Sequence, residues 1–257
     1  MNAFVGALTL AAIITLGIGG GDSSTDATQV TDLITVIREH QAHVSMHPLF
    51  GMLADRTIPA RKRMSFAPYL VYFVITFADV LETWVQIPQP KTELEEQINV
   101  YVKEETFHYN YFFHDMKVLG YTVDRFGSFE GVIRHVWGDE SRPMREFMYT
   151  LIHLVKKYND PVVTLAMFEA VEATGEILFK KINEEVVMPE GGLQGLRYFG
   201  ELHLELERNH TQTNWYKEKE VAASLQDMQI THEQRENSLL AIDEIFQRYA
   251  PARLPSI

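Results

Sequence analysis

The sequence contains no cysteine. Disulfide bonds, thiolate catalysis, zinc fingers and cysteine-ligated iron–sulfur clusters are therefore excluded. Basic residues are scarce, with 23 Lys and Arg against 35 Asp and Glu, which gives a formal net charge of −12. This acidic balance argues against general nucleic-acid binding, because proteins neutralise phosphates with a basic surface. Without thiolates, any metal ion must be held by His, Asp, Glu or backbone oxygen, and the chain has 10 His and 35 carboxylates to supply such ligands.

Long uncharged apolar runs are also rare, and the clearest one spans residues 3–20. No Lys or Arg precedes Arg38, whereas a secretory signal has a basic segment before its apolar core. The run includes several glycines and is short for a membrane span. We therefore expect an apolar extension and linker over residues 1–27, a helical domain over 28–250 and a tail over 251–257. We expect a cytoplasmic location; membrane anchoring or export through residues 3–20 is the alternative.

No segment alternates apolar and polar residues as a half-buried strand does, and the sequence has no internal repeat. Apolar residues instead recur at helical spacing along most of the chain. Two capping boxes, Thr92-x-x-Glu95 and Thr231-x-x-Gln234, mark helix starts. The sequence predicts a single all-α domain with helices over residues 28–43, 66–86, 92–119, 128–137, 143–157, 161–187, 193–211 and 231–249.

The predicted 92–119 helix carries two polar residues, Glu105 and His108, within its apolar seam. At about 100° per residue, both fall within roughly 60° of arc of the apolar residues on that face. The neighbouring Glu104 points about 100° away from Glu105. Because a buried carboxylate without a partner is costly, a cation or hydrogen bonds must lie beside Glu105. Glu-x-x-His places two metal ligands on one helical face. The alternative is a structural pair, in which Glu105 and His108 satisfy each other or a nearby Arg.

Three more ligand candidates share one face of the predicted 193–211 helix. His203, Glu207 and His210 stand at positions i, i+4 and i+7, within about 60° of arc. The charged residues Glu205 and Arg208 lie on the opposite side, where charges usually stay in water. This segregation favours a metal site, and a core hydrogen-bond network is the alternative.

Two further carboxylates complete the candidate set. On the 161–187 helix, Glu172 lies closest to the apolar side and is the preferred inward carboxylate, with Glu169 as its rival. On the 66–86 helix, Asp79 falls on the polar strip, and Glu82 is the other acidic residue. Asp79 is interpreted as a metal ligand, as a hydrogen-bond acceptor behind a ligand, or as part of the solvent-facing side.

The combined pattern resembles the heme-oxygenase-like di-iron oxidase superfamily. The likeness rests on Glu105-x-x-His108, on one inward Glu in a later helix, and on His203-x-x-x-Glu207-x-x-His210 beyond it. The phrases HPLF, EETFHYNYFFHDMKVLGY and YFGELHLELERNH are similar to a bacterial branch of iron-containing redox enzymes in this superfamily. The resemblance spans roughly residues 28–250.

The resemblance implies a fold, a cofactor and an activity. The fold is a heme-oxygenase-like bundle of about seven helices around two iron ions, although the same ligands suit Mn(II) or Zn(II). The activity is oxidation of a small organic substrate by O₂ at a C–H or N–H bond, desaturation or oxidative cleavage, with electrons from an unidentified donor. No catalytic residue is expected beyond the metal ligands. The implied ligands are Glu105, His108, Glu172, His203, Glu207, His210 and Asp79.

Two ligands depart from the family pattern, and two other functions stay open. Glu207 stands where the family usually has Asp, and Asp79 stands where it places a Glu. A metal-free helical-bundle binding protein would use the same inward side chains only to stabilise its core. A thiaminase-like hydrolase of this fold relies on a cysteine, which the chain lacks. The analogy allows a homodimer, and no nucleic-acid partner is expected.

Overall fold

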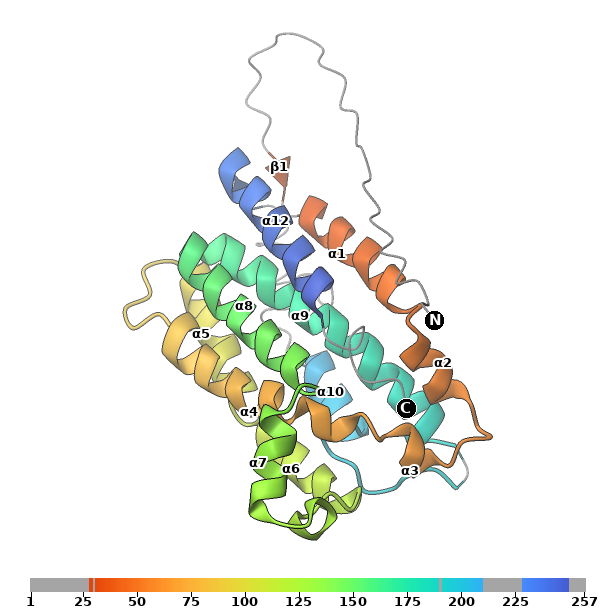
Figure 1. Cartoon of the computed structure of the whole chain (residues 1–257). Coiled ribbons are helices and arrows are strands. Elements are labelled where there is room, and N and C mark those ends of the chain that lie inside the picture. Colours follow the sequence, from red (N-terminus) through yellow and green to blue (C-terminus); the bar gives the residue numbers. More distant parts are fainter. Residues whose placement is uncertain (1–27, 30, 190, 210–227, 250–257) are drawn as a thin grey trace, which may run out of the picture.

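The computed structural model describes residues 28–29, 31–189, 191–209 and 228–249, and these residues are mostly helical (Figure 1). Strands β1 (Thr28–Gln29) and β2 (Gln229–Ile230) form one short antiparallel pair. The predicted all-α class is confirmed. The α-helices are α1 (Thr31–Val44), α2 (Pro48–Ala54), α3 (Ala60–Arg63), α4 (Val71–Val80), α5 (Glu93–Glu105), α6 (His108–Val118), α7 (Phe129–Trp137), α8 (Arg142–Tyr158), α9 (Pro161–Ile182), α10 (Glu201–Asn209) and α12 (His232–Arg248).

Helix α9 is the centre of the fold. Every residue from Val162 to Val171 is buried, because neighbouring helices cover α9 on all sides. Helices α1 and α12 pack on one side of α9, and α5 and α8 pack on the other (Figure 1). A second hydrophobic cluster joins the C-terminal part of α9 to α2, α6 and the segment before α10. Four of the candidate ligands, Glu105, His108, Glu172 and His203, lie where these two clusters meet.

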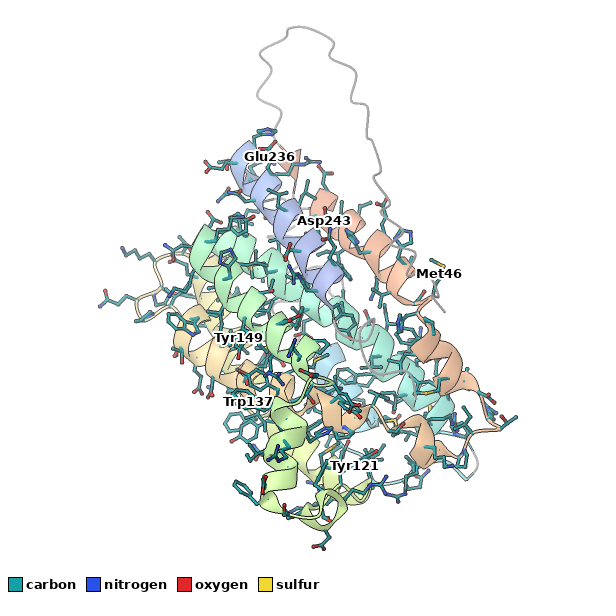
Figure 2. The ribbon with its side chains drawn as sticks, viewed as in Figure 1. Met46, Tyr121, Trp137, Tyr149, Glu236 and Asp243 are labelled. Atoms are coloured by element: carbon teal, nitrogen blue, oxygen red, sulfur yellow. The ribbon has the colours of Figure 1, made fainter. Side chains whose placement is uncertain are left out.

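Helix α12 illustrates how an amphipathic sequence covers α9. Its buried face consists of Ser238, Ala241, Ile242, Ile245 and Phe246. Figure 2 shows Glu236 and Asp243 on its outer side, where both are solvent-exposed. An ion pair of 2.7 Å between His40 Nε2 and Asp243 Oδ1 ties α12 to α1.

The prediction of one continuous helix over residues 92–119 was wrong, because the chain forms two helices there. Helix α5 ends at Glu105, two turn residues follow, and α6 begins at His108. Thr106 and Phe107 keep right-handed backbone angles, so the chain continues in nearly the same direction. The Thr106 hydroxyl donates to the Lys103 carbonyl at 3.2 Å, a side-chain bond that competes with the helical ladder. The break therefore falls between the two candidate ligands.

The predicted 193–211 helix starts later than expected. Residues 193–200 form a loop in which Gly195 has φ = +80°, and α10 begins at Glu201. The end expected at residue 211 lies outside the described residues. The two capping boxes, by contrast, are both confirmed, at Thr92 and at Thr231.

Several short elements extend the predicted helices. Helix α4 follows a 3-10 turn (Ala67–Leu70) and continues into a π-helical turn (Leu81–Val85), and α9 continues into another π-helical turn (Asn183–Val187). Helix α2 was not expected. Its proline stands at the first position, and His47 Nδ1 accepts a hydrogen bond from the Leu49 N–H at 3.2 Å. Among the described residues, the stretch Ala60–Val85 is long and apolar enough to cross a membrane, and half of its most apolar window is buried inside the protein.

Candidate metal centre

Three of the predicted ligands meet in the interior. Glu105, His108 and His203 have exposed fractions of 5%, 7% and 2%. His108 Nδ1 lies 2.8 Å from Glu105 Oε2 and 3.0 Å from His203 Nε2. The two imidazole rings cross nearly at right angles, with centroids 4.4 Å apart. Glu105 and His108, three residues apart at the α5–α6 junction, and the distant His203 of α10 therefore bring one oxygen and two nitrogen atoms together.

The hydrogen-bond partners of His203 determine where its proton lies. His203 Nδ1 is 2.9 Å from the Tyr198 carbonyl oxygen, which can only accept a hydrogen bond. Nδ1 therefore carries a proton, and in the tautomer protonated there Nε2 presents a lone pair. A carboxylate oxygen of Glu105 and Nε2 of His203 can both accept a hydrogen bond, so a proton on His108 Nδ1 can be donated toward either of them.

A cavity of about 60 Å³ adjoins these three residues. It has room for about four water-sized molecules. Its wall includes Glu172 as a fourth candidate ligand, and Glu172 Oε1 accepts a hydrogen bond of 2.6 Å from the Tyr101 hydroxyl. The rest of the wall is mainly apolar and aromatic: Leu70, Phe73, Val74, Phe77, Met144, Phe147, Val171, Leu178, Phe179, Tyr198 and Tyr249, with Tyr109, Thr174 and Gly175.

The charge of the cavity wall is negative. Two carboxylates line it, and none of its described lining residues is Lys or Arg. Carboxylates in an apolar wall stabilise a cation and repel an anion. This wall is therefore suited to a metal cation or to a neutral or cationic organic molecule.

The two candidate carboxylates of α9 differ in position. Glu172 is half-buried and lines the cavity, whereas Glu169, one helical turn earlier, is 3% exposed and is not part of the cavity wall. Helical periodicity could not show which of Glu169 and Glu172 lines the cavity, because α9 is apolar on nearly every side.

The structure does not bring Asp79 to the other ligands. Asp79 and Glu82 are exposed and line a separate outward hollow of about 280 Å³ with Thr106, Phe107 and other residues. The polar strip of the 66–86 segment faces solvent there, which is one of the three interpretations set out above. The two hollows share one lining residue, Tyr109.

Two predicted ligands lie beyond what the structure describes. Glu207 belongs to α10, but its side chain, like all of His210, is outside the described residues. Within the described part of the chain, no group of three or more His, Asp and Glu side chains is arranged so that it could hold a metal ion. The observed centre is a hydrogen-bonded trio beside a small acidic cavity.

Sequence reasoning missed the polar residues that support His203. Asp115 is fully buried, and its two oxygens accept hydrogen bonds from the backbone N–H groups of Arg197 and Phe199, at 2.7 and 2.9 Å. Burial raises the pKa of the Asp115 carboxyl, and these backbone hydrogen bonds oppose that rise. The sequence contains a pattern that could have indicated a buried Asp115, because this residue stands seven positions after His108, on the same face of its helix.

The chain was also compared with known proteins. It matches no family model, and no curated protein is similar to it. The likeness to the heme-oxygenase-like di-iron oxidases therefore depends on the motifs and is a hypothesis about this chain.

Proposed function

We propose that this protein is a non-haem iron oxidase that uses O₂ to oxidise a small organic substrate, in a helical bundle of the heme-oxygenase-like type. One observation carries the proposal: Glu105, His108 and His203, from three different helices, place three ligand-type atoms side by side in the interior, next to an acidic cavity. Carboxylate and imidazole without thiolate is a ligand set suited to Fe(II), Mn(II) or Zn(II).

The donor spacing is compatible with either a shared proton or a cation at this position. Two atoms that bind one ion at about 2.1 Å, at right angles, are about 3.0 Å apart. The contacts of His108 Nδ1 with Glu105 and His203, at 2.8 and 3.0 Å, are close to that spacing. A bound cation would replace the proton between these atoms and would interact favourably with the buried Glu105 carboxylate.

Two ions need more ligands than this trio. Glu172 faces the same cavity from α9, and Glu207 and His210 follow His203 in the sequence. We assign these residues to the second ion, and Asp79 is not needed for this set. When bound, a pair of iron ions supplies the electrons that activate O₂ for attack on a C–H or N–H bond.

The protein's own residues exclude water and orient the reactants. The aromatic rings of Phe73, Phe77, Phe147 and Phe179 line the cavity and leave only about 60 Å³ in it. An apolar wall of this kind admits O₂ and a neutral organic group, and the carboxylates disfavour an anionic one. The substrate class that follows is a small neutral or cationic molecule with an apolar body.

The test is O₂ consumption after anaerobic loading of the full chain with Fe(II). We expect rapid O₂ uptake in the wild type and a loss of at least tenfold in Glu105→Gln, because the variant removes a ligand without changing shape. Glu104→Gln is the matched control, since it makes the same change one residue away in the chain. Equal O₂ uptake in Glu105→Gln and the wild type would overturn the proposal.

A metal-free binding protein is the second candidate. The hydrogen bonds of the trio favour it, because the His108 ring can link Glu105 and His203 through a proton. Elemental analysis of protein purified from cells grown with iron distinguishes the two candidates. Iron well below one ion per chain, together with no Fe(II) uptake on reconstitution, would favour the binding protein.

A further inference from the structure

The loop before α10 is held by polar side chains from two other elements. From α6, His114 Nε2 lies 2.9 Å from the Gly195 carbonyl, and Asp115 accepts the N–H groups of Arg197 and Phe199. From the π-helical turn after α9, Asn183 Nδ2 donates to the Phe199 carbonyl at 3.1 Å. The loop is therefore fixed by tertiary hydrogen bonds.

Asp115 and His203 bind opposite sides of one peptide group. The N–H of Phe199 and the C=O of Tyr198 belong to the same planar peptide unit. Asp115 Oδ2 accepts that N–H at 2.9 Å, and the carbonyl oxygen is 2.9 Å from His203 Nδ1. A continuous chain of hydrogen bonds therefore runs from a buried carboxylate, through a peptide group, to an imidazole.

This chain has two consequences for His203. The carboxylate fixes the plane of the peptide, and the peptide carbonyl fixes the ring and its proton on Nδ1. Hydrogen bonds in series also polarise one another, so the negative charge of Asp115 makes the carbonyl a stronger acceptor. Metal-binding histidines commonly donate their second N–H to a carbonyl or carboxylate, and such partners tune their affinity for the ion.

We infer that Asp115 is a positioning residue, which acts through the Tyr198–Phe199 peptide group to hold His203 with its Nε2 lone pair toward His108 and the cavity. Asp115 lies on α6, two helical turns after His108. Helix α6 thus positions both imidazoles: it carries His108 itself, and it holds His203 through the loop. The effect on metal affinity rests on the proposed function, whereas the effect on the His203 proton does not.

The first test reads the His203 proton in the metal-free full chain, by nitrogen-15 NMR of the ring, with His203→Gln to assign the signals. In the wild type we expect Nδ1 to carry the proton. In Asp115→Asn, an NH₂ group replaces one of the two carboxylate oxygens. This NH₂ group is a donor and cannot accept the backbone N–H opposite it, so one of the two hydrogen bonds is lost. We expect the Nδ1 and Nε2 signals of His203 to move toward each other, because the two tautomers then exchange.

Asp160→Asn is the matched control. Asp160 also accepts hydrogen bonds from two backbone N–H groups, those of Val162 and Val163, at the start of α9 and away from the cavity wall. It makes the same Asp-to-Asn change at a half-buried helix start without touching the loop that holds His203, so its His203 signals should match those of the wild type. An unchanged His203 tautomer in Asp115→Asn overturns the inference. A wild-type His203 protonated on Nε2 overturns it as well, and this measurement does not depend on the folding of Asp115→Asn.

The second test is the affinity of the same proteins for Co(II), followed by the visible spectrum of the bound ion. We expect Asp115→Asn to weaken binding by about 10- to 100-fold, as loss of an outer partner of a ligating His does. Asp160→Asn should change it by less than about twofold. Equal affinity in Asp115→Asn and the wild type overturns the positioning role while the proposed function stands. No Co(II) binding by the wild type instead contradicts the proposed function, and the tautomer result stands on its own.

Discussion

At the scale of single residues, the candidate centre depends on protons and lone pairs. The Tyr198 carbonyl fixes the proton of His203 on Nδ1, so the lone pair of Nε2 faces the proton of His108. Glu105 shares that same proton. A carboxylate and two imidazoles gathered in the interior form a favourable environment for a cation, and this is the physical reason for proposing a metal there.

The bond between Tyr101 and Glu172 gives a prediction at this scale. Tyr101 is 4% exposed, and its hydroxyl donates to Glu172 at 2.6 Å. Tyr101→Phe should lower the free energy of unfolding by about 1.5–3 kcal/mol, because a carboxylate loses a hydrogen bond in the interior. Urea denaturation measures the change. Tyr149→Phe is the control, since Tyr149 is exposed and its hydroxyl makes only a long hydrogen bond, of 3.4 Å, with that of Tyr72. Its effect should stay within about 0.5 kcal/mol, and an equally small effect at Tyr101 would contradict the prediction.

At the scale of elements, the break between α5 and α6 sets the relation of Glu105 to His108. Thr106→Ala removes the hydroxyl bonded to the Lys103 carbonyl and introduces a better helix former. We expect the free energy of unfolding to rise by up to about 0.5 kcal/mol and Co(II) affinity to fall, because a continuous helix turns Glu105 relative to His108.

Thr150→Ala in α8 is the control for that prediction. Thr150 is also half-buried, and its hydroxyl donates to the Glu146 carbonyl at 2.9 Å within an uninterrupted helix. It should give a similar gain in stability with unchanged Co(II) affinity. If Thr106→Ala leaves Co(II) affinity at the wild-type level, the break has no role in placing the ligands.

The contact of the π-helical turn after α9 with the loop after α2 predicts a pH effect. Glu185 bonds Lys181 at 3.1 Å and Arg56 at 3.2 Å, and these cations hold its pKa below the ordinary value of 4.5. The folded state therefore binds this proton less tightly than the unfolded state, so the stabilisation is present above pH 4.5 and is lost as the pH falls through the lowered pKa. Glu185→Gln should have a lower melting temperature than the wild type at pH 6, with the difference shrinking at pH 4 and below. A difference that grows on acidification would contradict this.

The sequence predicted the regular elements better than the places where the chain leaves them. Periodicity and capping predicted α7, α8, α9 and α12 to within a few residues, because these helices are fixed by local signals and apolar faces. The loop at 193–200 was missed, since its backbone bonds go to Asp115 and Asn183 from distant segments. For the site, helical periodicity correctly predicted that Glu105, His108 and His203 are buried. Spacing alone could not show that Asp79 faces solvent.

At the scale of the whole molecule, metal binding is linked to folding. An ion that binds the native state at 100 times its dissociation constant adds about 2.7 kcal/mol to the free energy of unfolding. For a chain of this length, that corresponds to a rise of about 5–10 °C in the melting temperature. We expect this shift on addition of Fe(II) without oxygen, and its reversal by a chelator. A shift of the same size in His203→Gln would place the ion elsewhere on this acidic protein.

The most direct test of the central claim is an anaerobic equilibrium titration of the full chain with Fe(II), compared with the same titration of His203→Gln. The account predicts saturable binding of up to two ions per chain in the wild type and the loss of at least one of them in the variant. No saturable binding in the wild type, or the same stoichiometry and affinity in both proteins, would contradict it.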